Sequence, residues 1–297
     1  MNLTNQKSKK NSQGKENRRY LMKDYNKVIS LRKQGYSYNQ IAEIVNISST
    51  TAQLWVKTTR KPRIVYATQK QQRQMKSKSR KLTPELAYIY GVLIGDGCIE
   101  ISPYSSRIAL HVTDKDFAEK FYQTLKQWSS FTPTWMESIR ISNHRTKYGK
   151  VIRSNSKRYT VRLGSKQIIK FITKKFKWKT KDWCVPMCIK KSKNKKIISY
   201  FLKGIFDSEG FPILDLKNRT RRIEIEMWGE QLKQIQELLK RLDIESTVIK
   251  GKRGKGRGTY ILRIIRKESI KLFAKHINFT IKRKNKKLSE LLNSYLK

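Results

Sequence analysis

An internal repeat from residue 82 onward is the feature that most constrains the fold. The first copy starts with LTPELAYIYGVLIGDG (82–97) and the second with IISYFLKGIFDSEG (197–210). In each copy alternating strands follow, such as RIALHV (107–112) and RIEIEM (222–227), then an amphipathic helix, a second strand pair and a closing helix. Alternation of apolar and polar residues predicts sheets with one buried face. The pattern therefore predicts an α+β fold in which an αββαββα unit occurs twice with pseudo-symmetry.

Small residues recur every four positions in the two helical segments that begin the copies. Ala87, Gly91 and Gly95 form one stripe of the first segment, and Gly204 and Ser208 form one stripe of the second. A glycine inside a helix costs about 1 kcal/mol relative to alanine, so these glycines indicate close approach of another backbone. The matching stripes predict that the two helices pack against each other.

An acidic residue stands at the same place in each copy, Asp96 in the first and Glu209 in the second. Each is followed by a glycine that we expect to terminate its helix. Packing of the two helices would bring the carboxylates together at negative helix ends, which is unfavourable unless a cation lies between them. Mg²⁺ binds through one or two carboxylates plus phosphates and can assist in-line phosphoryl displacement. We therefore predict a catalytic metal site at Asp96 and Glu209, with Gly95 and Ser208 beside it. A plain surface turn is the alternative for either acid taken alone.

The charge balance limits the choice of partner. The chain has 68 Lys and Arg against 22 Asp and Glu, a formal net charge of +46. Such an excess repels itself unless a polyanion is near, and nucleic acid is the common polyanion. No acidic residue lies between Glu43 and Glu85 or between Glu137 and Asp182, so whole faces are expected to be positive. A generic basic protein, such as a ribosomal one, is the alternative.

Arginines occupy polar positions of several predicted strands, on the face away from the core. A sheet with one basic face suits a DNA groove, which β-ribbons can enter. Arg140 lies between Ile139 and Ile141, which the alternation assigns to the core side. In the second half Glu224 and Glu226 occupy equivalent positions, so the basic face is less clear there. The candidate DNA contacts of the strands are Arg107, Arg140, Arg158, Arg162, Arg222 and Arg263.

The segments YGVLIGDG and LKGIFDSEG resemble the paired signature of LAGLIDADG homing endonucleases in their single-chain, two-repeat form, and the resemblance covers roughly residues 82–297. It implies two repeats that form a DNA-binding saddle, a monomer, double-stranded DNA as partner and Mg²⁺ as cofactor. In this family the last acidic residue of each motif binds metal, which carries over to Asp96 and Glu209. Asp207 matches an earlier acidic position of the motif. The first copy has Ile94 there, so we assign Asp207 no catalytic role.

The resemblance also implies a basic residue near the end of each repeat, which would stabilise the charged phosphate transition state. In the second half Lys282 is the best match. In the first half FKWKTKDW (176–183) offers Lys179 or Lys181, and the choice stays open. In so basic a chain, a solvated lysine or a phosphate contact is the alternative for each. The family further implies a long, nearly asymmetric target site, short 3′ overhangs and a gene inside an intron or mobile element.

Residues 20–60 have the pattern of a helix-turn-helix DNA-binding module. Ser37 is expected to cap the second of three helices, Asn46 to take a positive φ at the turn, and Ser48 or Ser49 to cap the third helix. A small helical bundle that binds protein is the alternative. The third helix would present four residues to a major groove: Ser49, Thr50, Gln53 and Lys57.

Composition shifts divide the chain into five expected segments. They are a disordered basic arm (1–19), the helix-turn-helix module (20–60), a basic linker (61–81), repeat 1 (82–190) and repeat 2 (191–297).

The remaining sequence features concern the compartment. The cysteines Cys98, Cys184 and Cys188 include no CxxC pair, and we expect them to be reduced and structural. No apolar run could span a bilayer, and the N-terminus lacks the apolar core of a secretory signal. We therefore expect no membrane partner and a reducing intracellular location, such as the cytoplasm of a microbe or phage-infected cell, or an organelle.

Taken together, these features predict a site-specific, metal-dependent double-strand DNA endonuclease of the homing type. The alternative is a non-catalytic DNA- or RNA-binding protein of the same fold, such as a transcription regulator or an intron maturase. Retention of both acids argues against it. A transposase or resolvase built around the helix-turn-helix is a second rival, and it would need a separate catalytic serine or acidic triad.

Overall fold

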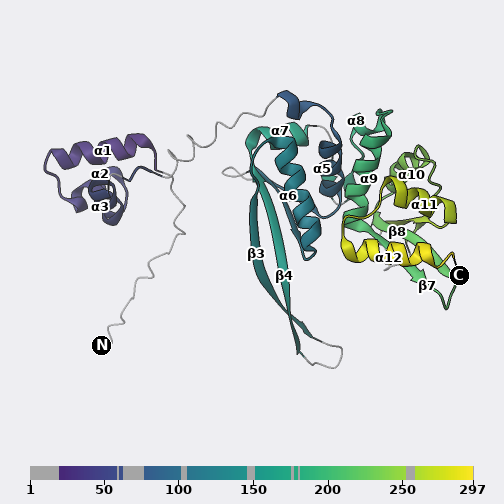
Figure 1. The fold of residues 1–297 in the computed structure, drawn as a ribbon. Helices are drawn as coiled ribbons and strands as arrows, with labels where there is room; N and C mark the ends of the chain where they lie inside the picture. The colour runs from purple at the N-terminus through teal and green to yellow at the C-terminus, as the bar shows by residue number, and fades with distance from the viewer. Residues whose placement is uncertain are drawn as a thin grey trace, which may run out of the picture. The chain divides into compact units, whose positions relative to one another are not determined.

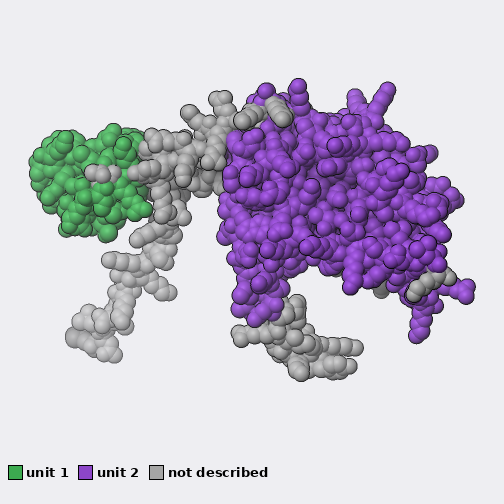
Figure 2. Space-filling view, in the orientation of Figure 1, with its two compact units in different colours: residues 1–73 green, residues 74–297 purple. Residues whose placement is uncertain are grey.

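The computed structural model of the chain divides into two compact units, residues 1–73 and 74–297 (Figure 2). The predicted basic arm, 1–19, and residues 63–76 of the predicted linker lie outside the described part of the chain. The structure describes residues 20–58, 60–62, 77–101, 106–145, 151–174, 177–179, 181–251 and 258–296.

The described residues of the smaller unit form three helices, α1 (Met22–Lys33), α2 (Tyr38–Val45) and α3 (Ser49–Thr58). The rings of Tyr20 and Tyr25 pack against Trp55 with centroids 5.4 and 5.7 Å away, which ties the start of the module to α3. The buried core consists of Tyr25, Val28, Ile41, Val45, Ala52 and Trp55.

The turns of this unit follow the predicted capping chemistry. The Ser37 hydroxyl accepts a hydrogen bond from the Gln40 backbone, and the Gln40 side chain accepts one from the Ser37 backbone, so α2 begins with a capping box. Asn46 follows α2 with a φ of 55°. Of the two candidate caps of α3, Ser48 and Ser49, the structure shows Ser48: its hydroxyl accepts a hydrogen bond from the Thr51 backbone nitrogen at 3.1 Å.

The larger unit repeats one order of elements (Figure 1). The first half contains α5 (Pro84–Ile94), β1 (Gly97–Ile101), β2 (Ser106–Val112), α6 (Lys115–Ser129), β3 (Thr134–Arg145), β4 (Val151–Gly164) and α7 (Lys166–Thr173). The second half contains α9 (Lys195–Glu209), β7 (Gly210–Asp215), β8 (Thr220–Trp228), α10 (Leu232–Lys240), β9 (Thr247–Lys250), β10 (Thr259–Ile264) and α11 (Lys267–His276). The antiparallel sheets have the matching orders β1-β2-β4-β3 and β7-β8-β10-β9. This agreement confirms the predicted α+β fold with two αββαββα copies.

Short elements flank and connect the two halves. The strands β5 (Trp178–Lys179) and β6 (Asp182–Trp183) and the helix α8 (Met187–Lys190) lie between α7 and α9. A further helix, α12 (Lys282–Asn293), follows α11. The repeat pattern did not predict α12, because lysines dominate its sequence and few apolar residues mark its buried side.

The predicted linker, 61–81, extends too far. Its last residues form the short 3-10 helix η1 (Ser77–Arg80) within the larger unit. Ser79 is buried there: its hydroxyl donates to the Trp128 carbonyl, and the Trp128 indole donates to the Ser79 carbonyl. This reciprocal pair fixes residues just before repeat 1 onto α6.

The helices α5 and α9 pack with their backbones in close approach, as their glycines require. A Cβ on Gly91 would lie 2.9 Å from the Ile205 nitrogen and 3.0 Å from the Gly204 Cα. A Cβ on Gly204 would lie 2.9 Å from the Val92 nitrogen. Because the obstructing atoms are backbone, a side chain at either position could be accommodated only by separating the helices.

The expectation that a glycine ends each helix holds for Gly210, the cap residue of α9, and is wrong for Gly97, because α5 already ends at Ile94 with Gly95 as its cap. Neither glycine is left-handed. Gly210 has a φ of −80°, Gly97 is not among the positive-φ residues, and both begin strands. A side chain is excluded for a different reason. A Cβ would lie 2.8 Å from the Val92 carbonyl oxygen at Gly97, and 2.6 Å from the Phe206 carbonyl oxygen at Gly210.

The β3–β4 hairpin extends past the helices that cover the first sheet (Figure 1). Ile139 and Ile141, which the alternation assigned to the core side, are 68% and 61% exposed. The assignment is wrong because alternation identifies the two faces of a strand but not how far the core extends along it. Among the described residues no helix combines the length and apolar character needed to cross a bilayer.

Candidate active site and nucleic-acid interface

The two repeated acids lie where the ends of α5 and α9 meet. Asp96 follows directly after Gly95, the cap residue of α5, and Glu209 is the last residue of α9. A Cβ on Gly95 would lie 2.8 Å from the Ser208 hydroxyl and 3.3 Å from the Glu209 Cγ. The small residues therefore allow the two acid-bearing chain segments to touch.

The pKa values of both carboxyls are raised, which makes them harder to ionise. Burial, and then the charge of Asp96, raises the pKa of Glu209 from its ordinary 4.5 to about 7, against the opposing charge of Lys284. Burial also raises the pKa of Asp96. By accessible surface Glu209 is half-buried, whereas Asp96 is exposed. Two neighbouring carboxyls are a donor set that fits a hard divalent cation, since such a cation would relieve the repulsion.

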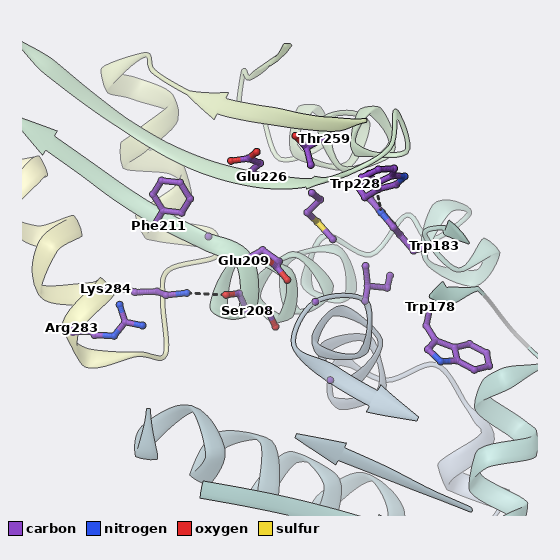
Figure 3. Close-up of a pocket in the computed structure, with 15 residues that line it drawn as sticks. Trp178, Trp183, Ser208, Glu209, Phe211, Glu226, Trp228, Thr259, Arg283 and Lys284 are labelled. Carbon is purple, nitrogen blue, oxygen red and sulfur yellow. Dashed lines mark hydrogen bonds between the residues drawn. The ribbon is translucent and has the colours of Figure 1, made fainter. Parts of the chain in front are cut away.

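A lysine that the sequence analysis did not identify lies beside the pair. Lys284 of α12 is 6% exposed, and its amine donates to the backbone oxygens of Asp207 at 2.6 Å and Ser208 at 3.2 Å. A cation is favoured at these carbonyls because they form the negative end of α9. Burial lowers the pKa of Lys284, and the charge of Asp207 opposes this change. Figure 3 shows the amine directed at Ser208, close to Glu209.

A cavity of about 760 Å³ opens beside Glu209 (Figure 3). Three tryptophans, Trp178, Trp183 and Trp228, contribute to its wall, and the Trp183 indole donates to the Trp228 carbonyl at 2.8 Å. Lys284 also lines it, whereas Asp96 is not among its lining residues. The cavity is therefore reached by one acid of the pair, with aromatic rings on its wall.

The open face of the first sheet carries the four predicted arginines of that half. The register pairs Arg107 with Gly164, Ala109 with Arg162, Ser138 with Arg158 and Arg140 with Ser156. Because directly opposed residues of antiparallel strands project from the same face, these arginines share one face. The residues that alternate with them include Val161 and Leu163, which are buried.

In the second sheet, two predicted arginines form ion pairs with a glutamate of the same sheet. The Nε atoms of Arg222 and Arg263 lie 2.6 and 2.5 Å from the same Glu224 carboxylate oxygen, and the Glu224 side chain is 7% exposed. Positive charge on this face is thus partly neutralised.

The chain was compared with protein-family models and with known proteins. A family model described as a LAGLIDADG-like domain matches residues 196–278. A second model, the helix-turn-helix domain of resolvase, matches residues 17–51. The uncharacterized protein MJ0398 of Methanocaldococcus jannaschii is 31% identical over 91% of this chain and 93% of that protein. The chain belongs to the family of MJ0398.

Other similarities are more distant or more local. The glutamine–fructose-6-phosphate aminotransferase of the same organism is 30% identical over 71% of this chain, which spans 18% of that enzyme. The homing endonuclease I-WcaI bound to its DNA recognition sequence has a TM-score of 0.48 at 14% identity, covering 74% of this chain and 92% of that one. Full-length DUF199/WhiA from Thermatoga maritima has a TM-score of 0.42 at 15% identity, covering 74% and 66%.

The three lysines predicted from the resemblance are all exposed. Lys282 is exposed on the first turn of α12, and its backbone nitrogen donates to Asp116. Lys179 is exposed in β5. Lys181 is exposed as well, with its amine 4.9 Å from the centroid of the Trp228 ring. None of the three is among the described residues that line the cavity.

Asp207 is held in the interior of this domain by hydrogen bonds. It is fully buried and accepts hydrogen bonds from the Tyr88 hydroxyl at 2.9 Å and the Thr280 backbone at 2.7 Å. Burial raises the pKa of Asp207. The residue thus links α5, α9 and the segment before α12.

The predicted groove residues of the helix-turn-helix module differ in accessibility. On α3, Thr50 and Lys57 are exposed, whereas Ser49 and Gln53 are half-buried. Leu54, on the same helix, is 41% exposed.

Proposed function

We propose that the chain is a site-specific, metal-dependent double-strand DNA endonuclease of the homing type that acts as a monomer. The observation that carries the proposal is the meeting of Asp96 and Glu209 at the paired ends of α5 and α9, beside a buried lysine and an open cavity.

Double-stranded DNA is the partner best supported by charge and by domain content. The chain carries a net charge of +46, and phosphate contacts dominate DNA affinity. Arginines share the open face of the first sheet. The helix-turn-helix match supports a second DNA contact, in which Thr50 and Lys57 would reach a groove, with Ser49 and Gln53 contributing less surface.

Asp96 and Glu209 would hold the Mg²⁺, which when bound activates water and stabilises the leaving oxygen of a phosphodiester. Because the pKa of Glu209 is about 7, this carboxyl must release its remaining proton to serve as a ligand. Gly95 and Ser208 keep the site narrow, since neither places a large side chain between the acids. Lys284, fixed by the carbonyls of α9, would hold a positive charge where negative charge develops on the phosphate.

The direct test uses the full chain and a plasmid library with a randomised segment, with Mg²⁺ or with a chelator. We expect wild type to enrich one cut sequence only with Mg²⁺. Asp96→Asn and Glu209→Gln should bind that sequence with unchanged affinity and lose cleavage by about 100-fold or more. Deletion of residues 1–60 should weaken binding and shorten the footprint at one end, and an unchanged footprint would remove the DNA role of that module.

A non-catalytic DNA-binding protein is the second candidate, and one observation favours it. Lys284 already supplies a cation near the acid pair, so the pair is partly neutralised without metal. This candidate predicts that wild type and both acid variants bind DNA equally and that none cuts at any Mg²⁺ concentration.

A further inference from the structure

A second cluster of ligand-type side chains lies on the open face of the first sheet, where β1 follows Asp96 of the acid pair. Cys98 and Glu100 belong to β1, and His111 belongs to β2. Cys98 pairs with Ala109 and Glu100 with Arg107, so the three side chains project from the same face. Their sulfur, oxygen and nitrogen ligand atoms all lie within 4.8 Å of one another.

The spacing of these atoms suits one small metal ion. Zinc bonds of 2.0–2.3 Å place tetrahedral ligand atoms roughly 3.3–3.8 Å apart. The Nε2 of His111 already lies 3.9 Å from a Glu100 carboxylate oxygen. Ala109, between Arg107 and His111 along β2, has too small a side chain to fill the space. Only small side-chain rotations are therefore needed to bring the three ligands to bonding distance.

Neighbouring residues orient two of the three ligands. The Nδ1 of His111 is hydrogen-bonded to the Thr160 hydroxyl at 2.9 Å, which directs Nε2 towards Glu100. Arg107 bonds one oxygen of Glu100, and the other oxygen faces His111. Such outer partners are what metal-binding histidines and carboxylates require for a fixed orientation.

The chemistry of the donors selects the class of ion. A thiolate, an imidazole and a carboxylate together suit Zn²⁺, whereas Mg²⁺ takes oxygen ligands. The thiolate and carboxylate charges balance the two charges of the ion, so Arg107 and Arg162 would face a nearly neutral site. The side chains of His111 and Glu100 are 20% and 37% exposed, which leaves room for a water as fourth ligand.

We propose that Cys98, Glu100 and His111 form a zinc site that joins β1 to β2 on the basic face. The site differs from the acid pair in its residues and in its preferred metal. It does not depend on whether the chain cleaves DNA.

The test titrates chelator-treated full chain with Co²⁺, a zinc substitute with visible spectra. We expect one thiolate-bound Co²⁺ per chain, counted from its thiolate-to-cobalt charge-transfer band, and loss of this band on adding Zn²⁺. Cys98→Ser and His111→Asn should abolish the band and weaken Zn²⁺ binding about 100-fold or more, and Thr160→Val about 10-fold. Cys184→Ser, which removes a different thiol, and Glu209→Gln, which alters the acid pair, should leave the spectrum unchanged.

Alkylation of the wild-type thiols gives a second readout that needs no variant to fold. Zn²⁺ should slow labelling of Cys98 at least about 10-fold and leave labelling of Cys184 unchanged. Absence of the cobalt band in wild type, its survival in Cys98→Ser, or equal labelling of Cys98 with and without Zn²⁺ would each overturn the proposal.

Discussion

The two repeats share a topology but differ in charge on their open sheet faces. In the first, Arg140, Arg158 and Arg162 lie on one face along a hairpin whose strands have 12 and 14 residues. In the second, Arg222 and Arg263 bond the same buried Glu224, and the corresponding strands have 4 and 6 residues. A duplicated fold can thus keep its helix pair symmetric while the two sheets diverge.

The difference extends to the acid pair. Asp96 follows the end of α5, whereas Glu209 is still within α9, whose final carbonyls are bonded by Lys284. The cavity with its tryptophan wall also lies on the Glu209 side. Under the proposed function, the first repeat would hold the DNA and the second repeat would position the chemistry.

The helix pair is where the repeats are most alike, so breaking it should have the largest effect. Gly204→Leu would force a side chain into the Gly91 backbone, and we expect a loss of about 3 kcal/mol or more of unfolding free energy. Urea denaturation would measure it. Gly164→Ala, whose new Cβ would have its nearest neighbour 3.9 Å away, should change stability by less than about 0.5 kcal/mol. Equal losses in the two variants would contradict close packing as the cause.

Substitution of Lys284 tests the difference between the ends of α5 and α9, since Lys284 bonds the final carbonyls of α9. Lys284→Met removes the amine that bonds the carbonyls of Asp207 and Ser208, and we expect a loss of roughly 2 kcal/mol. Lys282→Met, two residues earlier on an exposed position, should cost less than about 0.5 kcal/mol. Thermal unfolding of both variants would measure these two losses of stability. If Lys282 proved the more sensitive position, the assignment of Lys284 to the site would be wrong.

Many of the features that the two repeats share could be predicted from the sequence, because these features depend on local periodicity. The repeat, the glycine stripes and the matched acids come from spacing along one segment at a time. Lys284 escaped notice although Lys284, Leu288 and Leu291 recur at helical spacing. From sequence alone, a lysine at an inward position of a helix is expected to be solvent-exposed, because its buried hydrogen-bond partners are not known.

The remaining errors have a common physical origin in contacts between distant segments. Ile139 and Ile141 alternate as expected along β3 but are exposed, because no other described part of the chain covers them. The proximity of Cys98 to His111 depends on the register between β1 and β2. The sharing of Glu224 by two arginines depends on the pairing of β8 with β10. No spacing rule along the chain gives these contacts.

The pH dependence of stability should report the acid pair. The folded pKa of Glu209, about 7, exceeds its ordinary 4.5, so the folded state binds this proton more tightly than the unfolded state. The contribution is present below about pH 4.5 and is lost as the pH rises through about 7. We expect wild type in chelator to lose stability over this window, and Glu209→Gln to lose less.

Three further measurements distinguish titration of Glu209 from general charge repulsion as the cause of this pH dependence. Asp96→Asn should also reduce the slope, because the charge of Asp96 contributes to the raised pKa of Glu209. Glu226→Gln, on the cavity wall, should leave it unchanged. Mg²⁺ should restore stability near pH 7.5 in wild type but not in Glu209→Gln. A slope that is identical in all four proteins would show that Glu209 does not carry it.

The smallest expected effect concerns the two sheet faces themselves. Each arginine that contacts a phosphate contributes about 1 to the slope of log affinity against log salt concentration. Arg158→Gln should lower the slope by about this amount. Arg263→Gln should lower it less, because Glu224 already neutralises part of that charge. Glu224→Gln should raise the slope, since it frees Arg222 and Arg263 together. Equal losses for Arg158 and Arg263 would mean that both sheets contact DNA alike, and the proposed division between a DNA-holding repeat and a chemistry-bearing repeat would then have to be abandoned.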